Sequence, residues 1–575
     1  MSPHRSPGHP SRSPGRSPGR SPDSWPLATL FFAGIALLAV TALVASCTSS
    51  TDEDAKLRSK TSAADPDRAV PQGADRGDKN KSPDYQVDLV DSDCVDRTTD
   101  TAAIDCYKLV VPENRAKPTG RQVELPVLRI RSVGTPAAGP PLVYLHGGPG
   151  AGAVEGWLAW QQLMDGVPRD LYVYDQRGGG HANPRLDCPE RSAALASTLA
   201  SHPAWAEARQ TVGDSIAACH KRLRSQGVEL SQYDTWNSVQ DLEDLRRAIG
   251  AESLALVGSS YGTRLALSYQ AQYPDRVDSL ALSGVDPPGT GGPKAERSLL
   301  EPALNRLFES CNTDLECAAK FPNLKVVFDE AARRLDATPA NLSDPFPIRV
   351  TGDELNAGVF AGLYDSATIP LLPAAITRIA SGDEAVWSSI GSQVAPFLGD
   401  DSAFGAQIGI SCGDLAASGS EGSSKSASDP GSKSSTDTSS GKANSSRDET
   451  AAASDPGRSR DLVLSGTYSF CGFWATDTAE RHAQASGPAT SPKSKASRNN
   501  PPPTLVIAGE LDPITPASDA RAAAKKLAGQ YVEIRRGGHD VMLSDPCARL
   551  SLRAFMVDPT APVDGCTKEI AAPFA

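Results

Sequence analysis

Short apolar runs alternate with helical segments in two separate parts of this chain, and this alternation constrains the fold most. The runs "PLVYLHGGPG" and "DLYVYDQRGGG" are followed by helical periodicity at 238–249 and another run at 254–257. The pattern returns from "TLVIAG" to the run at 531–534. Buried strands separated by helices are typical of a parallel sheet covered on both faces. We therefore predict an α/β fold built from residues 85–289 and 501–575.

A long stretch between these two parts lacks the alternation. Helical periodicity is present at 299–307, 326–335 and 372–379, with no clear strand between these segments. The sequence therefore predicts a helical lobe at 290–500, inserted into the sheet domain. Two polar segments inside it, 418–460 and 486–503, cannot form a core, so we expect them to be disordered.

The N-terminus predicts export. Arginines precede an apolar run at 27–45, and small residues lead to Cys47. Residues 1–46 are therefore interpreted as an export signal of the lipoprotein type, with Cys47 lipidated. The alternative is a membrane-spanning helix, because the run is long enough to cross a bilayer. Residues 47–84 are expected to form a flexible tether. Either interpretation places the folded part of the chain outside the cytoplasm, tethered to the membrane or secreted.

Cysteine number and charge narrow the classes of protein further. Removing Cys47 from the 11 cysteines leaves ten, an even number that favours disulfides in an exported chain. No C-x-x-C pair occurs, so we expect no metal site, and we expect no cofactor. A net charge of −12 argues against a nucleic-acid partner. Sequence leaves the connectivity open, but short loops favour five pairs: Cys94 with Cys106, Cys188 with Cys219, Cys311 with Cys317, Cys412 with Cys471, and Cys547 with Cys566.

The pattern G-x-S-x-G occurs twice, at 258–262 and at 15–19. The second match lies in a Ser/Pro/Arg repeat that cannot form a strand or a helix. The first follows a predicted strand and precedes a predicted helix, which places Ser260 at the carboxyl edge of the sheet. Ser259 is expected to pack into the sheet. The alternative for 258–262 is a glycine-rich turn without chemistry.

A serine needs a base to take its proton, and a third residue to orient that base. His539 lies in a Gly-Gly loop after the last predicted strand, although a loop histidine is commonly only solvated. Asp512 follows the strand "TLVIAG" and is the predicted acid, with Glu510 as the runner-up. The alternative role for Asp512 is to cap the next helix.

The negative charge that develops on an attacked carbonyl oxygen needs hydrogen-bond donors. The backbone N–H of Tyr261, directly after the candidate nucleophile, is one predicted donor. The bare backbone of "HGGPG" is expected to supply the other, from Gly147 or Gly148.

Five motifs together resemble the α/β-hydrolase serine exopeptidases of the proline iminopeptidase and tripeptidyl aminopeptidase group. They are "HGGPG" at 146–150, "DQRG" at 175–178, "GSSYGT" at 258–263, "GELDPITP" at 509–516 and "GGH" at 537–539. The late cysteines resemble the secreted actinobacterial branch. The resemblance implies an α/β-hydrolase fold with the inserted lobe as a cap, the triad Ser260, Asp512 and His539, and peptide substrates with free N-termini. The chain departs from the group at 179–182 and at Asp540.

Three functions stay open at this point. The first is a peptidase that releases one residue or a short peptide, a tripeptide included, from a free N-terminus. The second is a carboxylesterase with the same triad, and the third is a non-catalytic binding protein tethered to the cell surface. The peptidase requires carboxylates in the cap that face a protonated amine. Candidates are Glu301, Asp353, Glu354 and Asp365.

Overall fold

The computed structural model describes residues 85, 87–95, 103–132, 138–291, 298–343, 346–394, 402–417, 467–474, 501–563 and 574. All of them belong to the compact unit Ser82–Ala575. The predicted export signal, Cys47, the tether and the segments 418–460 and 486–500 lie outside the described residues. Among the described residues, no helix combines the length and apolar character needed to cross a bilayer.

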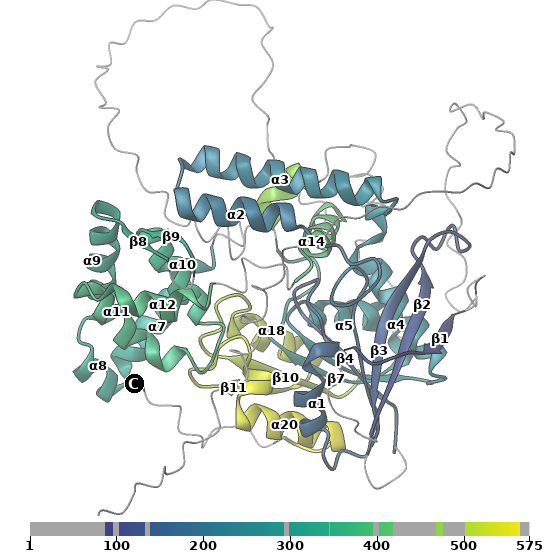
Figure 1. The fold of residues 1–575 in the computed structure, drawn as a ribbon. Helices are drawn as coiled ribbons and strands as arrows, with labels where there is room; N and C mark the ends of the chain where they lie inside the picture. The colour runs from purple at the N-terminus through teal and green to yellow at the C-terminus, as the bar shows by residue number, and fades with distance from the viewer. Residues whose placement is uncertain are drawn as a thin grey trace, which may run out of the picture. The chain divides into compact units, whose positions relative to one another are not determined.

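A nine-stranded sheet forms the centre of this unit, in the order β1-β2-β3-β5-β4-β6-β7-β10-β11 (Figure 1). The six strands β5, β4, β6, β7, β10 and β11 pair in parallel with their neighbours in this order. The strands β1, β2 and β3 pair antiparallel, and β3 also pairs antiparallel with β5. The predicted, mostly parallel sheet is confirmed. The strands are β1 Asp88–Asp91, β2 Ile104–Pro112, β3 Gln122–Ile130, β4 Leu142–Leu145, β5 Leu171–Tyr174, β6 Leu254–Ser259, β7 Val277–Ser283, β10 Thr504–Gly509 and β11 Gln530–Ile534.

Helices cover both faces of the sheet, because alternate strand residues point to opposite sides. Val143 and Leu145 of β4 join the buried cluster that contains Leu242 and Leu265, whereas Tyr144 joins the opposite cluster. The first face is covered by α4 (Thr235–Ala248), α5 (Tyr261–Gln272) and α18 (Ala517–Leu527). The second is covered by α1 (Trp157–Leu163), α19 (Val541–Ser544) and α20 (Pro546–Val557).

The parallel pairing brings six chain segments to one edge of the sheet. Tyr144 pairs with Val173, Leu145 with Gly258, Ser259 with Ser283, and Gly509 with Ile534. The loops that follow β4, β5, β6, β7, β10 and β11 therefore leave the sheet at the same edge. In open α/β sheets this carboxyl edge is where ligands bind.

The inserted lobe is largely helical, as predicted, but the expectation that it contains no strand is wrong. A small antiparallel sheet is formed by β8 (Ala340–Leu342) and β9 (Ile348–Val350). Strands of three residues are too short to produce a recognisable period of two in the sequence. The described helices of the lobe are α7 Leu300–Thr313, α8 Leu315–Lys320, α9 Leu324–Ala337, α10 Gly352–Gly362, α11 Leu372–Ala380, α12 Trp387–Gly391, α14 Phe404–Ala417 and α16 Cys471–Trp474.

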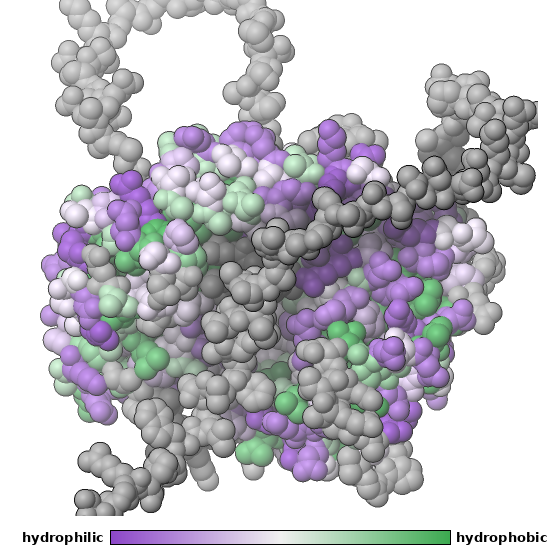
Figure 2. All heavy atoms as spheres, viewed as in Figure 1, coloured by the Kyte–Doolittle hydropathy of each residue, from purple (hydrophilic) through white to green (hydrophobic). Residues whose placement is uncertain are grey.

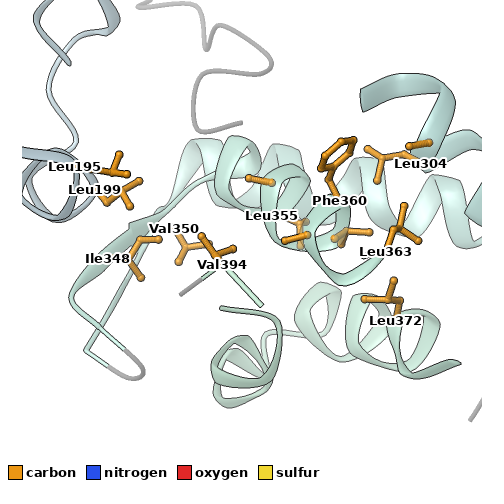
Figure 3. Packing of buried hydrophobic residues seen from close by; sticks show 14 of the residues in the cluster. Leu195, Leu199, Leu304, Ile348, Val350, Leu355, Phe360, Leu363, Leu372 and Val394 are labelled. Atoms are coloured by element: carbon orange, nitrogen blue, oxygen red, sulfur yellow. The ribbon is translucent and has the colours of Figure 1, made fainter. Parts of the chain in front are cut away.

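Two earlier helices share the hydrophobic core of this lobe. They are α2 (Pro189–Ser201) and α3 (Trp205–Ser225), which lie in the sequence range expected to form the sheet domain. Figure 3 shows Leu195 and Leu199 of α2 beside Ile348, and all three belong to one buried cluster with the lobe. The lobe is therefore assembled from two separate parts of the chain.

Four of the five favoured cysteine pairs are disulfide-bonded in the structure: Cys94–Cys106, Cys188–Cys219, Cys311–Cys317 and Cys412–Cys471. Cys547 is also disulfide-bonded, and its expected partner Cys566 lies outside the described residues. On the face shown in Figure 2, hydrophobic residues are scattered among hydrophilic ones over the described part of the chain.

Candidate active site

Ser260 occupies a strained turn between β6 and α5. Its φ of 54° and ψ of −125° lie in a region that side-chain-bearing residues rarely adopt, at a cost of about 1–3 kcal/mol. The surrounding hydrogen bonds hold it there: Ser260 N–H donates to the Ser283 carbonyl at 2.9 Å, and Thr263 Oγ1 donates to the Ser260 carbonyl at 2.6 Å. Ser259 instead hydrogen-bonds the side chain of Tyr144. The turn therefore presents Ser260, and not Ser259, at the sheet edge.

The two glycines of the motif are required by close packing. A Cβ on Gly258 would lie 2.7 Å from the carbonyl oxygen of Gly262, across the turn. A Cβ on Gly262 would lie 2.6 Å from the carbonyl carbon of Leu145, at the end of the neighbouring strand β4. The helix that begins after Ser260 can therefore approach β4 only because position 262 has no side chain.

Asp512 and His539 are in direct contact. His539 Nδ1 lies 2.8 Å from Asp512 Oδ2, and the Asp512 residue is only 1% exposed. An ionised carboxylate can only accept, so Nδ1 carries the hydrogen and Nε2 has a free lone pair. Asp512 also accepts hydrogen bonds from the N–H groups of Ile514 and Thr515. These bonds form a turn before α18, whose N-cap is Pro516 without a side-chain cap, so the alternative role of Asp512 as the cap of that helix is wrong.

Electrostatics in this pair favour a charged carboxylate. Burial by itself lowers the pKa of His539, but the charge and hydrogen bond of Asp512 outweigh it, and the net pKa is raised. Burial raises the pKa of Asp512, but His539 and Thr515 lower it below its ordinary value. The pair is therefore suited to accept a proton on the imidazole while the carboxylate stays ionised.

Gly284 lies close both to the residue that binds Ser260 and to the ring of His539. It directly follows Ser283, the residue whose carbonyl accepts from Ser260 N–H. A Cβ on Gly284 would lie 3.1 Å from His539 Cε1, the ring carbon next to Nε2. Ser260 and the His539 ring therefore flank the same two-residue segment at the end of β7. Glu510, the runner-up acid, instead accepts from Arg536 N–H at 2.8 Å.

The loop "HGGPG" lies against Ser260. A Cβ on Gly147 would lie 2.7 Å from Ser260 Cβ and 3.3 Å from its Oγ, so only glycine permits this approach. Gly148 has a φ of 114°, which also favours glycine. Tyr261 is the first residue of α5, and the N–H of a first helical residue has no acceptor within its helix. Of the predicted oxyanion donors, Tyr261 and Gly147 thus border Ser260.

The motif "DQRG" holds the glycine-rich loop in place, a role that sequence reasoning did not assign. Gln176 Nε2 donates to the His146 carbonyl at 2.8 Å. Asp175 Oδ1 accepts from the N–H groups of Ala153 and Val154 at 2.6 and 3.1 Å. The fully buried Arg177 forms two hydrogen bonds of 2.6 Å with Asp241, which fix the motif to α4. Only the resemblance could have drawn attention to these residues.

A lobe segment after α10 holds the histidine loop, and this contact was also missed. The N–H groups of His539 and Asp540 both donate to the Tyr364 carbonyl, at 3.0 and 3.1 Å. Ser366 Oγ accepts from Gly538 N–H at 3.0 Å and lies 2.7 Å from Asp540 Oδ1. The rings of Tyr364 and His539 meet edge to face, with centroids 5.3 Å apart. The lobe thus helps to position the candidate base.

The four lobe carboxylates expected to bind an amine have various surroundings in the structure. Glu354 is buried and forms a capping box with Thr351 at the start of α10, where Asp353 is also buried. Asp365 accepts from Ala367 N–H and from Thr368 Oγ1. Glu301 is exposed in the first turn of α7. In the described part of the chain, no group of three or more His, Cys, Asp or Glu residues could hold a metal ion.

A mostly parallel sheet with a serine in the turn after β6, an aspartate after β10 and a histidine after β11 defines an α/β-hydrolase. Two family matches agree: residues 140–309 match a family described as "alpha/beta hydrolase fold", and residues 460–568 match one described as "TAP-like protein". The chain thus has an α/β-hydrolase fold, and its C-terminal part is similar to TAP-like proteins.

Among named proteins, the chain is similar to a tripeptidyl aminopeptidase of Streptomyces lividans, with 27% identity over 42% of this chain and 44% of the relative. It is 28% identical to the serine protease Hip1 of Mycobacterium bovis, over 37% of this chain and 42% of the relative. A probable proline iminopeptidase of Leptolyngbya boryana is 26% identical, over 26% of this chain and 32% of the relative. The alignments thus span less than half of each relative.

Proposed function

We propose that this protein is a serine peptidase that releases one residue or a short peptide from free N-termini. The observation that carries the proposal is the 2.8 Å contact between His539 and Asp512, located beside the strained Ser260 turn. The similarity to proteins named tripeptidyl aminopeptidase, serine protease and proline iminopeptidase supports peptides as the substrates.

The reaction would proceed through an acyl-enzyme. Ser260 Oγ attacks the scissile carbonyl carbon while its proton passes to His539 Nε2, and Asp512 stabilises the resulting imidazolium. The carbonyl oxygen becomes an oxyanion, bound by the N–H of Tyr261 and by one from Gly147 or Gly148. His539 then protonates the leaving amine, and the C–N bond breaks. Water, deprotonated by His539, attacks the acyl-enzyme and releases the product acid and Ser260.

We further propose that the enzyme acts outside the cytoplasm. Disulfides persist in oxidising compartments, and the four bonded pairs support such a location. In this proposal residues 1–46 direct export, and Cys47 carries the lipid that anchors the mature protein. Metabolic labelling with a fatty acid, compared between the natural chain and Cys47→Ala, tests the anchor. Equal labelling of both chains would contradict it.

The main alternative is a carboxylesterase, because the same triad hydrolyses esters. The discriminating experiment compares free and N-acylated peptide anilides with p-nitrophenyl esters, in the natural enzyme and in Ser260→Ala. We expect cleavage of free-amine peptides, and its loss in Ser260→Ala with unchanged folding by circular dichroism. Turnover of esters alone would favour the esterase. Hydrolysis that survives in Ser260→Ala would refute the assignment of the nucleophile, and no hydrolysis of any substrate would favour the binding protein.

A further inference from the structure

Asp286 is fixed to the same turn that presents Ser260. It lies three residues after the end of β7, and its backbone N–H donates to Thr263 Oγ1 at 2.8 Å. The same Thr263 oxygen donates to the carbonyl of Ser260 at 2.6 Å. The position of Asp286 relative to the candidate nucleophile is therefore set by two consecutive hydrogen bonds, not by a long flexible loop.

Only one of the two carboxylate oxygens of Asp286 accepts a hydrogen bond from a described residue. Its Oδ1 accepts from Arg264 Nη2 at 2.7 Å, whereas Oδ2 has no hydrogen-bond partner among the described residues. The side chain is 27% exposed, compared with 6% for Arg264. A carboxylate oxygen has room for further donors, so Oδ2 can receive a hydrogen bond from a ligand.

The charge of Asp286 acts on the catalytic centre. Burial lowers and Asp512 raises the pKa of His539, and the negative charge of Asp286 adds to the raising effect. Gly284, two residues before Asp286, lies directly against the His539 ring. Asp286 therefore lies near both the His539 ring and the turn that holds Ser260.

The Arg264 guanidinium beside Asp286 is shared with a second carboxylate. Arg264 also pairs with Asp414 of α14, through Nη1 at 3.1 Å, so one guanidinium lies between two carboxylates. Asp414 has other partners: its Oδ2 accepts from Thr235 Oγ1 at 2.8 Å. When both carboxylates are ionised, the group of Asp286, Arg264 and Asp414 has a net charge of −1. A cationic ligand group beside it would be stabilised.

We propose that Asp286 binds the protonated α-amino group of the substrate through Oδ2, and so makes the enzyme selective for free N-termini. This inference rests on the proposed peptidase function and names its specificity residue. It places amine recognition on the sheet domain, instead of on Glu301, Asp353, Glu354 or Asp365 of the lobe. Arg264 is then a positioning residue, because it holds Oδ1 and leaves Oδ2 directed to the ligand.

The test uses Asp286→Asn in the full-length enzyme. Asparagine retains an oxygen that can accept from Arg264 but removes the negative charge. Substrates are p-nitrophenyl esters of one alanine and of three alanines, each with a free and with an acetylated N-terminus. Activated esters report on the triad whether or not amides are cleaved. Asp414→Asn is the matched control, because it weakens the same Arg264 pair from the other side.

We expect Asp286→Asn to lower kcat/KM about 10- to 100-fold for the free-amine ester of the preferred length, mainly through KM, since charge-assisted hydrogen bonds have this strength. The acetylated ester should change less than about twofold. Asp414→Asn also lowers the negative charge of this group but leaves Oδ2 of Asp286 in place, so it should lower the preference for free amines much less than Asp286→Asn does. An unchanged ratio of free to acetylated rates, or an equal loss on both esters, would overturn the proposal. A different result would refute the proposed peptidase function: cleavage of these esters by the natural enzyme without cleavage of any peptide anilide.

Discussion

Replacing Gly262 with alanine tests whether the contact between α5 and β4 positions the nucleophile. The added Cβ would lie 2.6 Å from the carbonyl carbon of Leu145, whereas ordinary contacts begin at 3.4 Å. The carbonyl oxygen of Leu145 would lie closer still, so the helix and the strand must separate by more than about 0.8 Å, at an overpacking cost of about 1–3 kcal/mol or more. Because Ser260 precedes α5 and "HGGPG" follows β4, this displacement separates the nucleophile from Gly147. Misplacement on the order of 1 Å can cost about 100-fold in rate.

We therefore expect Gly262→Ala to lower kcat/KM for a p-nitrophenyl ester by about 10- to 100-fold and to lower the urea midpoint of unfolding. Gly156→Ala is the matched control, because a Cβ there would meet nothing within 4 Å and its φ is −78°. This control should behave as the natural enzyme in both assays. If Gly262→Ala kept its activity within twofold and its unfolding midpoint, the packing argument would be wrong.

Four further predictions concern the site and its supports. Asp512→Asn should lower kcat on the order of 10³- to 10⁴-fold, because it loses the tautomer-fixing carboxylate. In the natural enzyme the raised pKa of His539 places the acid limb of kcat/KM above pH 6.5, since catalysis needs the neutral ring and activity rises with pH through that pKa; a limb below pH 6.5 would contradict this. Ser366→Ala removes the acceptor for Gly538 N–H and the donor to Asp540, and should lower kcat/KM about 3- to 10-fold with unchanged circular dichroism; an unchanged rate would refute positioning by the Ser366 side chain. Replacing Cys412 and Cys471 together with serine opens a loop with a sequence separation of 59 and should lower the free energy of unfolding by up to about 4 kcal/mol in urea titrations; an unchanged free energy would show that the disulfide does not constrain the unfolded chain.

The α/β architecture could be predicted because its signal is local. Runs such as 254–257 and "TLVIAG" are apolar throughout, as strands buried on both faces must be. The short strands β8 and β9 left no such signal, and the association of α2 and α3 with the lobe depends on contacts between segments far apart in the sequence. Helical periodicity reveals an apolar face but not which partner covers it.

The residues proposed for catalysis were found from their types, their order and the strands that precede them. Their supports were not: Gln176 and Asp175 hold the glycine-rich loop, and Tyr364 and Ser366 hold the histidine loop. These contacts join loops from different strands or domains, and polar residues in loops have no period that could identify them.

The sequence by itself determined which segments become buried strands and which turn can present a serine, because burial and backbone freedom depend on the local residue types. Only the tertiary structure brought Asp512 into contact with His539, placed Glu510 against Arg536, and located Asp286 beside the turn of Ser260. The reason is physical: the charge of a side chain is a property of its residue, but the direction in which that charge acts depends on which strands pair and where their loops end.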